Sequence, residues 1–147
     1  MSEKLYSIQD SSKYIDKLGH PGYSGKHWND GKIGKSYLKE LSKYTYMACT
    51  TCNEGYELLK YIECAEIGSV PIGEVPPSLV GTEAEKYIIK IPDEVLVNNT
   101  EFDKWFSNIN IDTKYTANKY RECIKDLRSK DRLKSNLLNN LNKNEIY

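Results

Sequence analysis

The chain has 147 residues and a mass of 16.9 kDa, a size typical of one domain, which we assign as 1–147. Its 21 basic residues balance its 21 acidic residues, and 39% of its residues are hydrophobic, so a collagen-like, coiled-coil or fully disordered chain is excluded. It has no apolar run of the roughly 18 residues that cross a bilayer, and its first residues lack the apolar segment of a signal peptide. We therefore expect a cytoplasmic or otherwise intracellular protein without a membrane partner.

The composition also indicates a kind of genome. Lysine (18 residues) far outnumbers arginine (three), and Asn, Tyr and Ile are abundant. This skew is typical of AT-rich genomes, so we expect a low-GC bacterium, a phage, a large virus or a protist as the source.

Helical spacing of apolar residues predicts most of the first half of the chain. The apolar residues of 7–18 fit a short helix. The segment 19–34 holds five of the nine glycines and is predicted to be a loop, because glycine loses the most backbone entropy in regular structure. Helical spacing resumes in 36–67, where we expect two helices that are broken or merged near residues 49–53.

The second half of the chain alternates between irregular and helical segments. The Pro/Gly-rich segment 68–92 excludes long helices, and its residues 87–91 form the best strand pattern in the chain. Pro92 and the two acids after it fit the first turn of another helix. Apolar residues at helical spacing in 113–142 predict one long basic helix, or two. We therefore predict a mainly α fold, with α+β as the alternative, whose middle segment carries one or two short strands.

A further helix is expected to begin near Thr100, which resembles a capping box with Asp103. The predicted core residues are aromatic or aliphatic and come from these helices and the strand: Tyr56, Leu59, Ile62, Ile89, Phe102, Trp105, Phe106 and Leu127.

Charge is distributed unevenly along the chain. The segment 74–112 has eight acidic residues against three lysines, and 113–147 has nine basic residues against four acidic ones. The two segments either pair with each other across the fold or leave the C-terminal helix with a basic face. In the second case Lys125, Arg128 and Arg132 are candidate contacts with a nucleic acid.

The most specific group of site residues is His20, His27, Cys49 and Cys52. Without an export signal, the cysteines are expected to be free thiols or metal ligands, and zinc prefers four such N and S donors. The order His-His-Cys-Cys is similar to that of the zinc module of retroviral-type integrases, although the resemblance covers only residues 20–52. We predict zinc as a candidate structural ion, with Cys64 able to replace one histidine. The alternative is that the histidines lie at the surface and the cysteines are packed in the core.

Three other types of site remain open from these residues. Cys49 and Cys52 form a CxxC motif similar to that of thioredoxin-like proteins, although the proline of Val70-Pro71 follows too soon for that family. The segment 31–36 resembles a phosphate-binding loop without its first glycine, which leaves nonspecific anion binding. His20 and His27 are also a candidate acid–base pair.

The function that these patterns favour is a small non-enzymatic binding or accessory protein. A protein partner is expected first and a nucleic acid second. The loop 19–34 is the predicted contact surface through Tyr23, His27 and Trp28, unless Trp28 packs in the core. The alternative function is a small metal-dependent or acid–base enzyme, similar to a nuclease, centred on the same loop.

Overall fold

The computed structural model describes residues 2–16, 35–51 and 59–129. Its α-helices are α1 (Ser2–Ile8), α2 (Lys35–Leu41), α3 (Leu59–Ile67), α4 (Asn99–Ser107) and α5 (Thr113–Leu127). Its strands are β1 (Tyr46–Cys49), β2 (Val70–Gly73) and β3 (Ile89–Lys90). Two 3₁₀ helices, η2 (Glu83–Tyr87) and η3 (Asp93–Val97), flank β3.

The three strands form one parallel sheet in the order β1-β2-β3. Residues 46–49 pair in register with 70–73, and Ile72 pairs with Ile89. Helix α3 lies in the chain between β1 and β2, as the crossover of two parallel strands requires. The prediction of a mainly α fold is therefore wrong: the fold is a mixture of α and β built on a parallel sheet.

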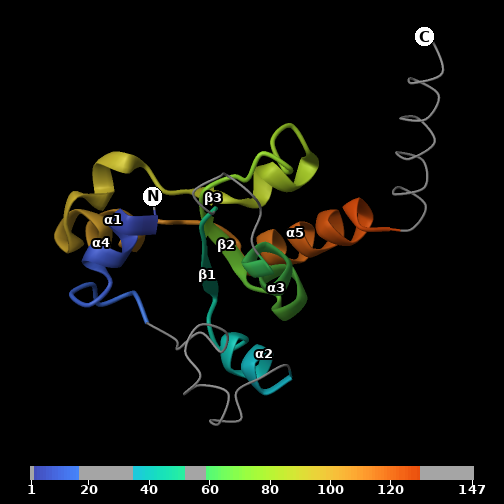
Figure 1. Ribbon diagram of the computed structural model, residues 1–147, viewed down its shortest axis with the longest axis horizontal. Helices are drawn as coiled ribbons and strands as arrows, with labels where there is room; N and C mark the ends of the chain where they lie inside the picture. The colour runs from blue at the N-terminus through green and yellow to red at the C-terminus, as the bar shows by residue number, and fades with distance from the viewer. Residues whose placement is uncertain (1, 17–34, 52–58, 130–147) are drawn as a thin grey trace.

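The sheet packs helices on both of its faces, as Figure 1 shows with α3 and α5 on one side and α1 and α4 on the other. A cluster on the first side, the α3/α5 cluster, joins β1 with both helices: Met47, Cys49, Tyr61, Cys64, Tyr120 and Ile124 are among its buried members. A cluster on the second side, the α1/α4 cluster, contains Ile8, Ile72, Ile91, Leu96 and Phe102. Burial on both faces is typical of parallel sheets.

The sequence of β2 does not resemble a strand, because it contains Pro71. Val70 donates its N–H to the carbonyl oxygen of Thr45, the residue before β1 (2.8 Å). Because successive N–H groups of a strand point to opposite sides, the nitrogen of Pro71 lies on the side of β3. Pairing with β3 begins only at Ile72, so the missing N–H of Pro71 breaks no ladder hydrogen bond.

The helices agree with the predictions in part. Helices α2, α3 and α5 lie where helical spacing predicts them, whereas the first helix spans Ser2–Ile8 and not 7–18. The predicted break near 49–53 coincides with the end of β1. Residues 19–34 and 130–142, a predicted loop and the end of the predicted basic helix, lie outside the described residues.

Side chains of two exposed residues cap α4 and α5. Asn98 accepts a hydrogen bond from the N–H of Glu101 at the start of α4 (2.9 Å), so the capping box predicted at Thr100 is wrong. Asp112 accepts one from the N–H of Tyr115 at the start of α5 (2.9 Å).

The predicted core is confirmed at Phe102, which is 3% exposed. It is wrong at Leu59, which is 69% exposed at the first position of α3. Trp105, Phe106 and Ile89 are partly buried against the α1/α4 cluster. Within residues 2–16, 35–51 and 59–129, none of the helices has both the length and the apolar character that crossing a bilayer requires.

Candidate functional site at the carboxyl edge of the sheet

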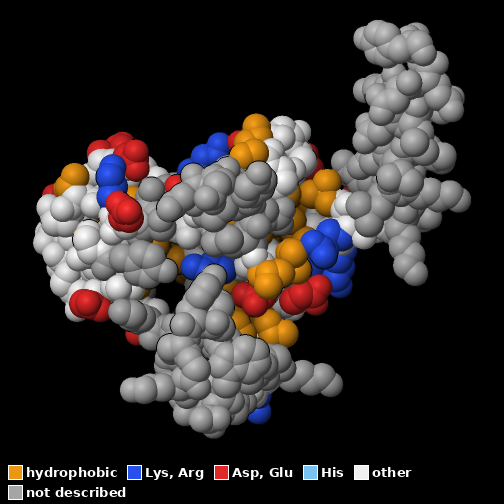
Figure 2. Space-filling view, in the orientation of Figure 1, with side chains coloured by type: hydrophobic (Ala, Val, Ile, Leu, Met, Phe, Trp, Pro, Cys, Tyr) orange, Lys and Arg blue, Asp and Glu red, His pale blue; other side chains and the backbone are white. Residues whose placement is uncertain are grey.

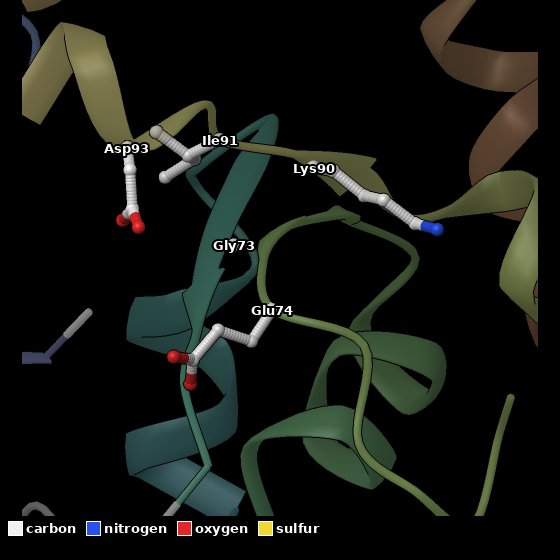
Figure 3. Close-up of a pocket in the computed structure, with 5 residues that line it drawn as sticks. All are labelled: Gly73, Glu74, Lys90, Ile91 and Asp93. Atoms are coloured by element: carbon white, nitrogen blue, oxygen red, sulfur yellow. The ribbon is translucent and has the colours of Figure 1, made fainter.

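A hollow of about 390 Å³ lies where β2 and β3 end (Figure 3). The residues that line it are Gly73, Glu74, Lys90, Ile91 and Asp93. Because parallel strands end at the same edge of their sheet, the residues that follow β2 and β3 converge there. This edge is the usual place of ligand sites in α/β folds.

The wall of the hollow at Gly73 is backbone packed on backbone. Gly73 has a φ of 147° and lies opposite Cys49 of β1, and a Cβ added to Gly73 would overlap the carbonyl oxygen of Cys49. On the other side, the Gly73 carbonyl accepts a hydrogen bond from the N–H of Ile91 (3.2 Å). Only glycine allows this conformation and this approach of two strands.

A buried tyrosine holds the ends of β1 and β2 together from beneath. The Tyr61 hydroxyl, on α3, shares its one proton between the carbonyl oxygens of Glu74 (2.9 Å) and Cys49 (3.2 Å). The N–H of Glu74 also donates to the carbonyl oxygen of Cys49 (3.0 Å). Tyr61 in turn accepts a bond from the Tyr120 hydroxyl on α5 through its carbonyl oxygen (3.2 Å). The helices on this side therefore fix the backbone that forms the hollow.

The carboxylate of Glu74 also connects β2 to the residue that follows β1. Its Oε2 atom accepts hydrogen bonds from the N–H (2.7 Å) and the hydroxyl (2.8 Å) of Thr51. Partial burial raises the pKa of Glu74, but the two bonds from Thr51 favour the charged form, and its pKa is lowered from the ordinary value of 4.5. Glu74 is therefore a fixed negative charge at the edge of the hollow near neutral pH.

The other two charged residues of the hollow lie at its rim. Lys90 forms an ion pair with Glu85 (2.7 Å), and Glu85 also accepts from the N–H of Gly81 (2.7 Å). Asp93 lies 3.5 Å from the ammonium of Lys4. Figure 3 shows the carboxylates of Glu74 and Asp93 on the same side of the hollow, whereas the Lys90 side chain runs in the opposite direction. That side of the hollow offers hydrogen-bond acceptors.

The structure describes only one of the four predicted zinc ligands. Cys49 is fully buried at the end of β1, whereas His20, His27 and Cys52 lie outside the described residues. Within the described ranges, no three His, Cys, Asp or Glu side chains are grouped to hold a metal ion. The zinc site thus stays a prediction.

The thioredoxin-like reading of the same cysteines is supported by one observation and opposed by another. Cys49 ends a strand, as that motif requires, and the next described helix begins at Leu59. The thiol that attacks in such motifs must be accessible, however, and Cys49 is fully buried.

The predicted contact residues of the basic helix lie near the end of α5. Lys125 and Arg128 are exposed, and Figure 2 shows Lys and Arg side chains gathered over this end of the helix. Arg132 lies outside the described residues, as do Tyr23 and Trp28 of the predicted contact loop.

One arginine of the basic helix has a structural role. Arg121 donates through Nε to the carbonyl oxygen of Ala65 (2.8 Å) and through a terminal nitrogen to that of Glu66 (3.2 Å). These carbonyls belong to the last turn of α3, so Arg121 caps that helix and fixes it to α5.

The acidic segment 74–112 forms its described ion pairs with lysines outside the basic helix. Within the described residues its ion pairs join Glu83 to Lys86, Glu85 to Lys90 and Asp93 to Lys4. The predicted pairing of this segment with the basic helix is therefore not made by ion pairs of the described residues, although α5 packs against η2.

Sequence reasoning missed the residues that line the hollow. Glu74, Lys90 and Asp93 belong to no motif, and their proximity follows only from the parallel pairing of β2 and β3. The signal in the sequence is positional: Gly73 ends β2, Glu74 follows it directly, and an acid lies three residues after β3. It becomes informative only after both strands are recognised.

The comparisons with known proteins give no relative for this chain: no protein family, no curated protein and no solved structure matches it.

Proposed function

We propose that the protein is a binding protein that holds a small polar molecule in the hollow at the carboxyl edge of its sheet. The observation that carries the proposal is the position of the 390 Å³ hollow, at the ends of two parallel strands. Ligands of open α/β sheets bind at this edge because the residues after each strand converge there. The volume lies toward the small end of ligand sites, which span roughly 300–1,000 Å³.

The lining favours a ligand that donates hydrogen bonds. Glu74 and Asp93 supply carboxylate oxygens, which accept hydrogen bonds. The ammonium of Lys90 is held by Glu85 and points away from these two carboxylates (Figure 3). A molecule with hydroxyl or amino groups therefore fits this side better than an anion does.

The proposal is tested by titrating the isotope-labelled protein with three sets of small probes and recording amide NMR shifts. The probes are polyols, primary amines and, as the opposite case, dicarboxylates. We expect a polyol or an amine to shift the amides of Gly73, Glu74 and Ile91 in a saturable way. Shifts confined to dicarboxylates, or saturable shifts only at residues away from the hollow, would contradict the proposal.

Variants at two acidic residues test whether the ligand binds in the hollow. Glu74→Ala is expected to abolish saturation, because it removes an acceptor from the hollow. Glu101→Ala, an exposed acid on α4 that does not line the hollow, is the matched control and is expected to leave the titration unchanged. Equal effects of the two variants would place binding elsewhere.

A second candidate function is contact with a nucleic acid through the end of α5. The observation that favours it is the exposure of Lys125 and Arg128, which lie outside the ion pairs that neutralise the acidic segment. Lysine and arginine side chains bind phosphates without reading sequence.

A further inference from the structure

Two free cysteines lie together in the α3/α5 cluster. Cys49 ends β1 and Cys64 lies in α3, and both side chains are 0% exposed. The Sγ atom of Cys49 lies 3.7 Å from the carbonyl oxygen of Lys60, which is one helical turn before Cys64. Both residues belong to the same buried cluster, in which α3 packs against β1.

We propose that Cys49 and Cys64 are a modification site: they form an intramolecular disulfide when the protein meets a peroxide. The two thiols lose two protons and two electrons, and a sulfur–sulfur bond forms. The oxygen–oxygen bond of hydrogen peroxide breaks and two water molecules are released. The reaction passes through one sulfenic acid, whose hydroxyl leaves as water when the second thiol attacks its sulfur.

The surroundings of the pair determine how the reaction proceeds. Cys64 donates through Sγ to the carbonyl oxygen of Ser69 (3.2 Å), and the neighbouring Cys49 side chain, together with burial, raises the pKa of its thiol. The reactive thiolate is therefore scarce, and neither thiol is accessible in the closed structure, so oxidation is slow. Because the second thiol is adjacent to the first, a sulfenic acid that forms there is captured before further oxidation.

The disulfide would act on the backbone of the hollow. The carbonyl oxygen of Cys49 accepts hydrogen bonds from Glu74 and Tyr61, and Thr51, two residues later, holds the Glu74 carboxylate. A bond from Cys49 to α3 thus constrains the end of β1 beside the hollow. The inference stands on the two thiols alone and does not depend on the proposed ligand.

The test uses the full chain with Cys52→Ser and Cys123→Ser, in which Cys49 and Cys64 are the only cysteines. The folded protein is incubated with hydrogen peroxide, alkylated and analysed by mass spectrometry. We expect the loss of two hydrogen atoms from the intact mass, no alkylated thiol, and full reversal by a reductant. Trypsin cleaves after Lys43, Lys60 and Lys86, so the disulfide joins peptide 44–60 to peptide 61–86.

A third substitution, Cys64→Ser, in the same background is the control. It is expected to prevent the loss of two hydrogen atoms and to leave Cys49 as a thiol or with added oxygen. If the two-cysteine protein keeps both thiols, gains oxygen atoms, or forms the disulfide only in denaturant, the proposal is overturned. If the two-cysteine protein does not fold, the same peptides of the wild-type chain answer the question, because fragmentation separates a bond at Cys49 from one at Cys52.

Discussion

Replacing Gly73 by even the small residue alanine is expected to destabilise the protein strongly. Its φ of 147° is a conformation that other residues avoid, and an added Cβ would overlap the carbonyl oxygen of Cys49. Gly73→Ala is therefore expected to lower the free energy of unfolding by about 3 kcal/mol or more, measured by urea denaturation.

Gly81→Ala is the control that measures the cost of a positive φ alone, without a clash of the added Cβ. Gly81 also has a positive φ, 74°, but no atom lies within 4 Å of its added Cβ. This substitution is expected to cost only about 1–2 kcal/mol, the cost of the left-handed conformation. Equal costs for the two glycines would show that the approach of β1 and β2 at Gly73 is looser than described.

The bonds between Thr51 and Glu74 predict a pH dependence. Because the pKa of Glu74 is lowered in the folded protein, its charged form contributes stability above the ordinary value of 4.5, and this contribution is lost as the pH falls through the lowered pKa. The melting temperature of the wild type is thus expected to fall more steeply below pH 4.5 than that of Glu74→Gln.

A carbon-detected NMR titration of the Glu74 carboxyl measures how much the hydroxyl bond from Thr51 contributes to the lowered pKa of Glu74. Thr51→Val removes the hydroxyl donor and keeps the N–H donor, so the Glu74 pKa is expected to rise in this variant. Thr100→Val, at an exposed residue of α4, is the control and is expected to leave it unchanged. An unchanged pKa in Thr51→Val would mean that the hydroxyl bond does not form in solution.

The burial of a single residue could be predicted where its residue type alone indicates it. Phe102 was placed in the core because a large aromatic side chain at helical spacing is rarely left in water, and it is buried. Leu59 had the same apolar character, but it occupies the first position of α3, where the side chain points past the core into solvent.

At the scale of elements, prediction succeeded where a pattern was long and failed where it was short. Helix α5 spans 15 residues, enough to repeat its apolar spacing several times. The strands span four, four and two residues, too few to display alternation. The residues of β1 were predicted as part of the helices on either side. Because of this one error, the predicted fold lacked the parallel sheet.

The end of α5 supports a prediction about nucleic acid. If Lys125 and Arg128 contact phosphates, binding of an oligonucleotide weakens with salt, with a slope of roughly 0.9 per contact for a duplex. Lys125→Glu with Arg128→Glu is expected to reduce that slope by about 2 and to lower affinity at low salt, measured by fluorescence anisotropy.

Lys104→Glu on α4 is the matched control for the single reversal Lys125→Glu, since this lysine is also exposed but lies on the other side of the sheet. It is expected to change the affinity less than Lys125→Glu does. Binding without salt dependence, or an equal effect of Lys104→Glu, would remove the nucleic acid from consideration at α5.

At the scale of the whole molecule, the hollow could not be predicted before the sheet. Its residues come from positions 73–74 and 90–93, which no local pattern connects. They meet because β1, β2 and β3 run parallel and end together, and parallel pairing depends on contacts between residues far apart in the sequence. The same long-range pairing brings Thr51, after β1, next to Glu74, after β2.

The shared sheet also predicts that the two core clusters unfold as one unit. Ile124 in the α3/α5 cluster and Ile72 in the α1/α4 cluster are each 4% exposed, so Ile124→Val and Ile72→Val are a matched pair. Each is expected to cost about 1 kcal/mol and to lower the melting temperature by about 2–4 °C. Because β2 contributes to both faces of the sheet, loss of either cluster removes the support of the other.

Two probes, one in each cluster, test this cooperativity. In a Trp28→Phe background the fluorescence of Trp105 reports on the α1/α4 cluster, and the methyl NMR signal of Ile88 reports on the α3/α5 cluster. Both probes are expected to give one melting temperature, which each substitution shifts equally for both. If Ile72→Val lowered the transition of Trp105 and left that of Ile88 in place, the three strands would not couple the two faces, and the molecule would consist of two separately stable halves.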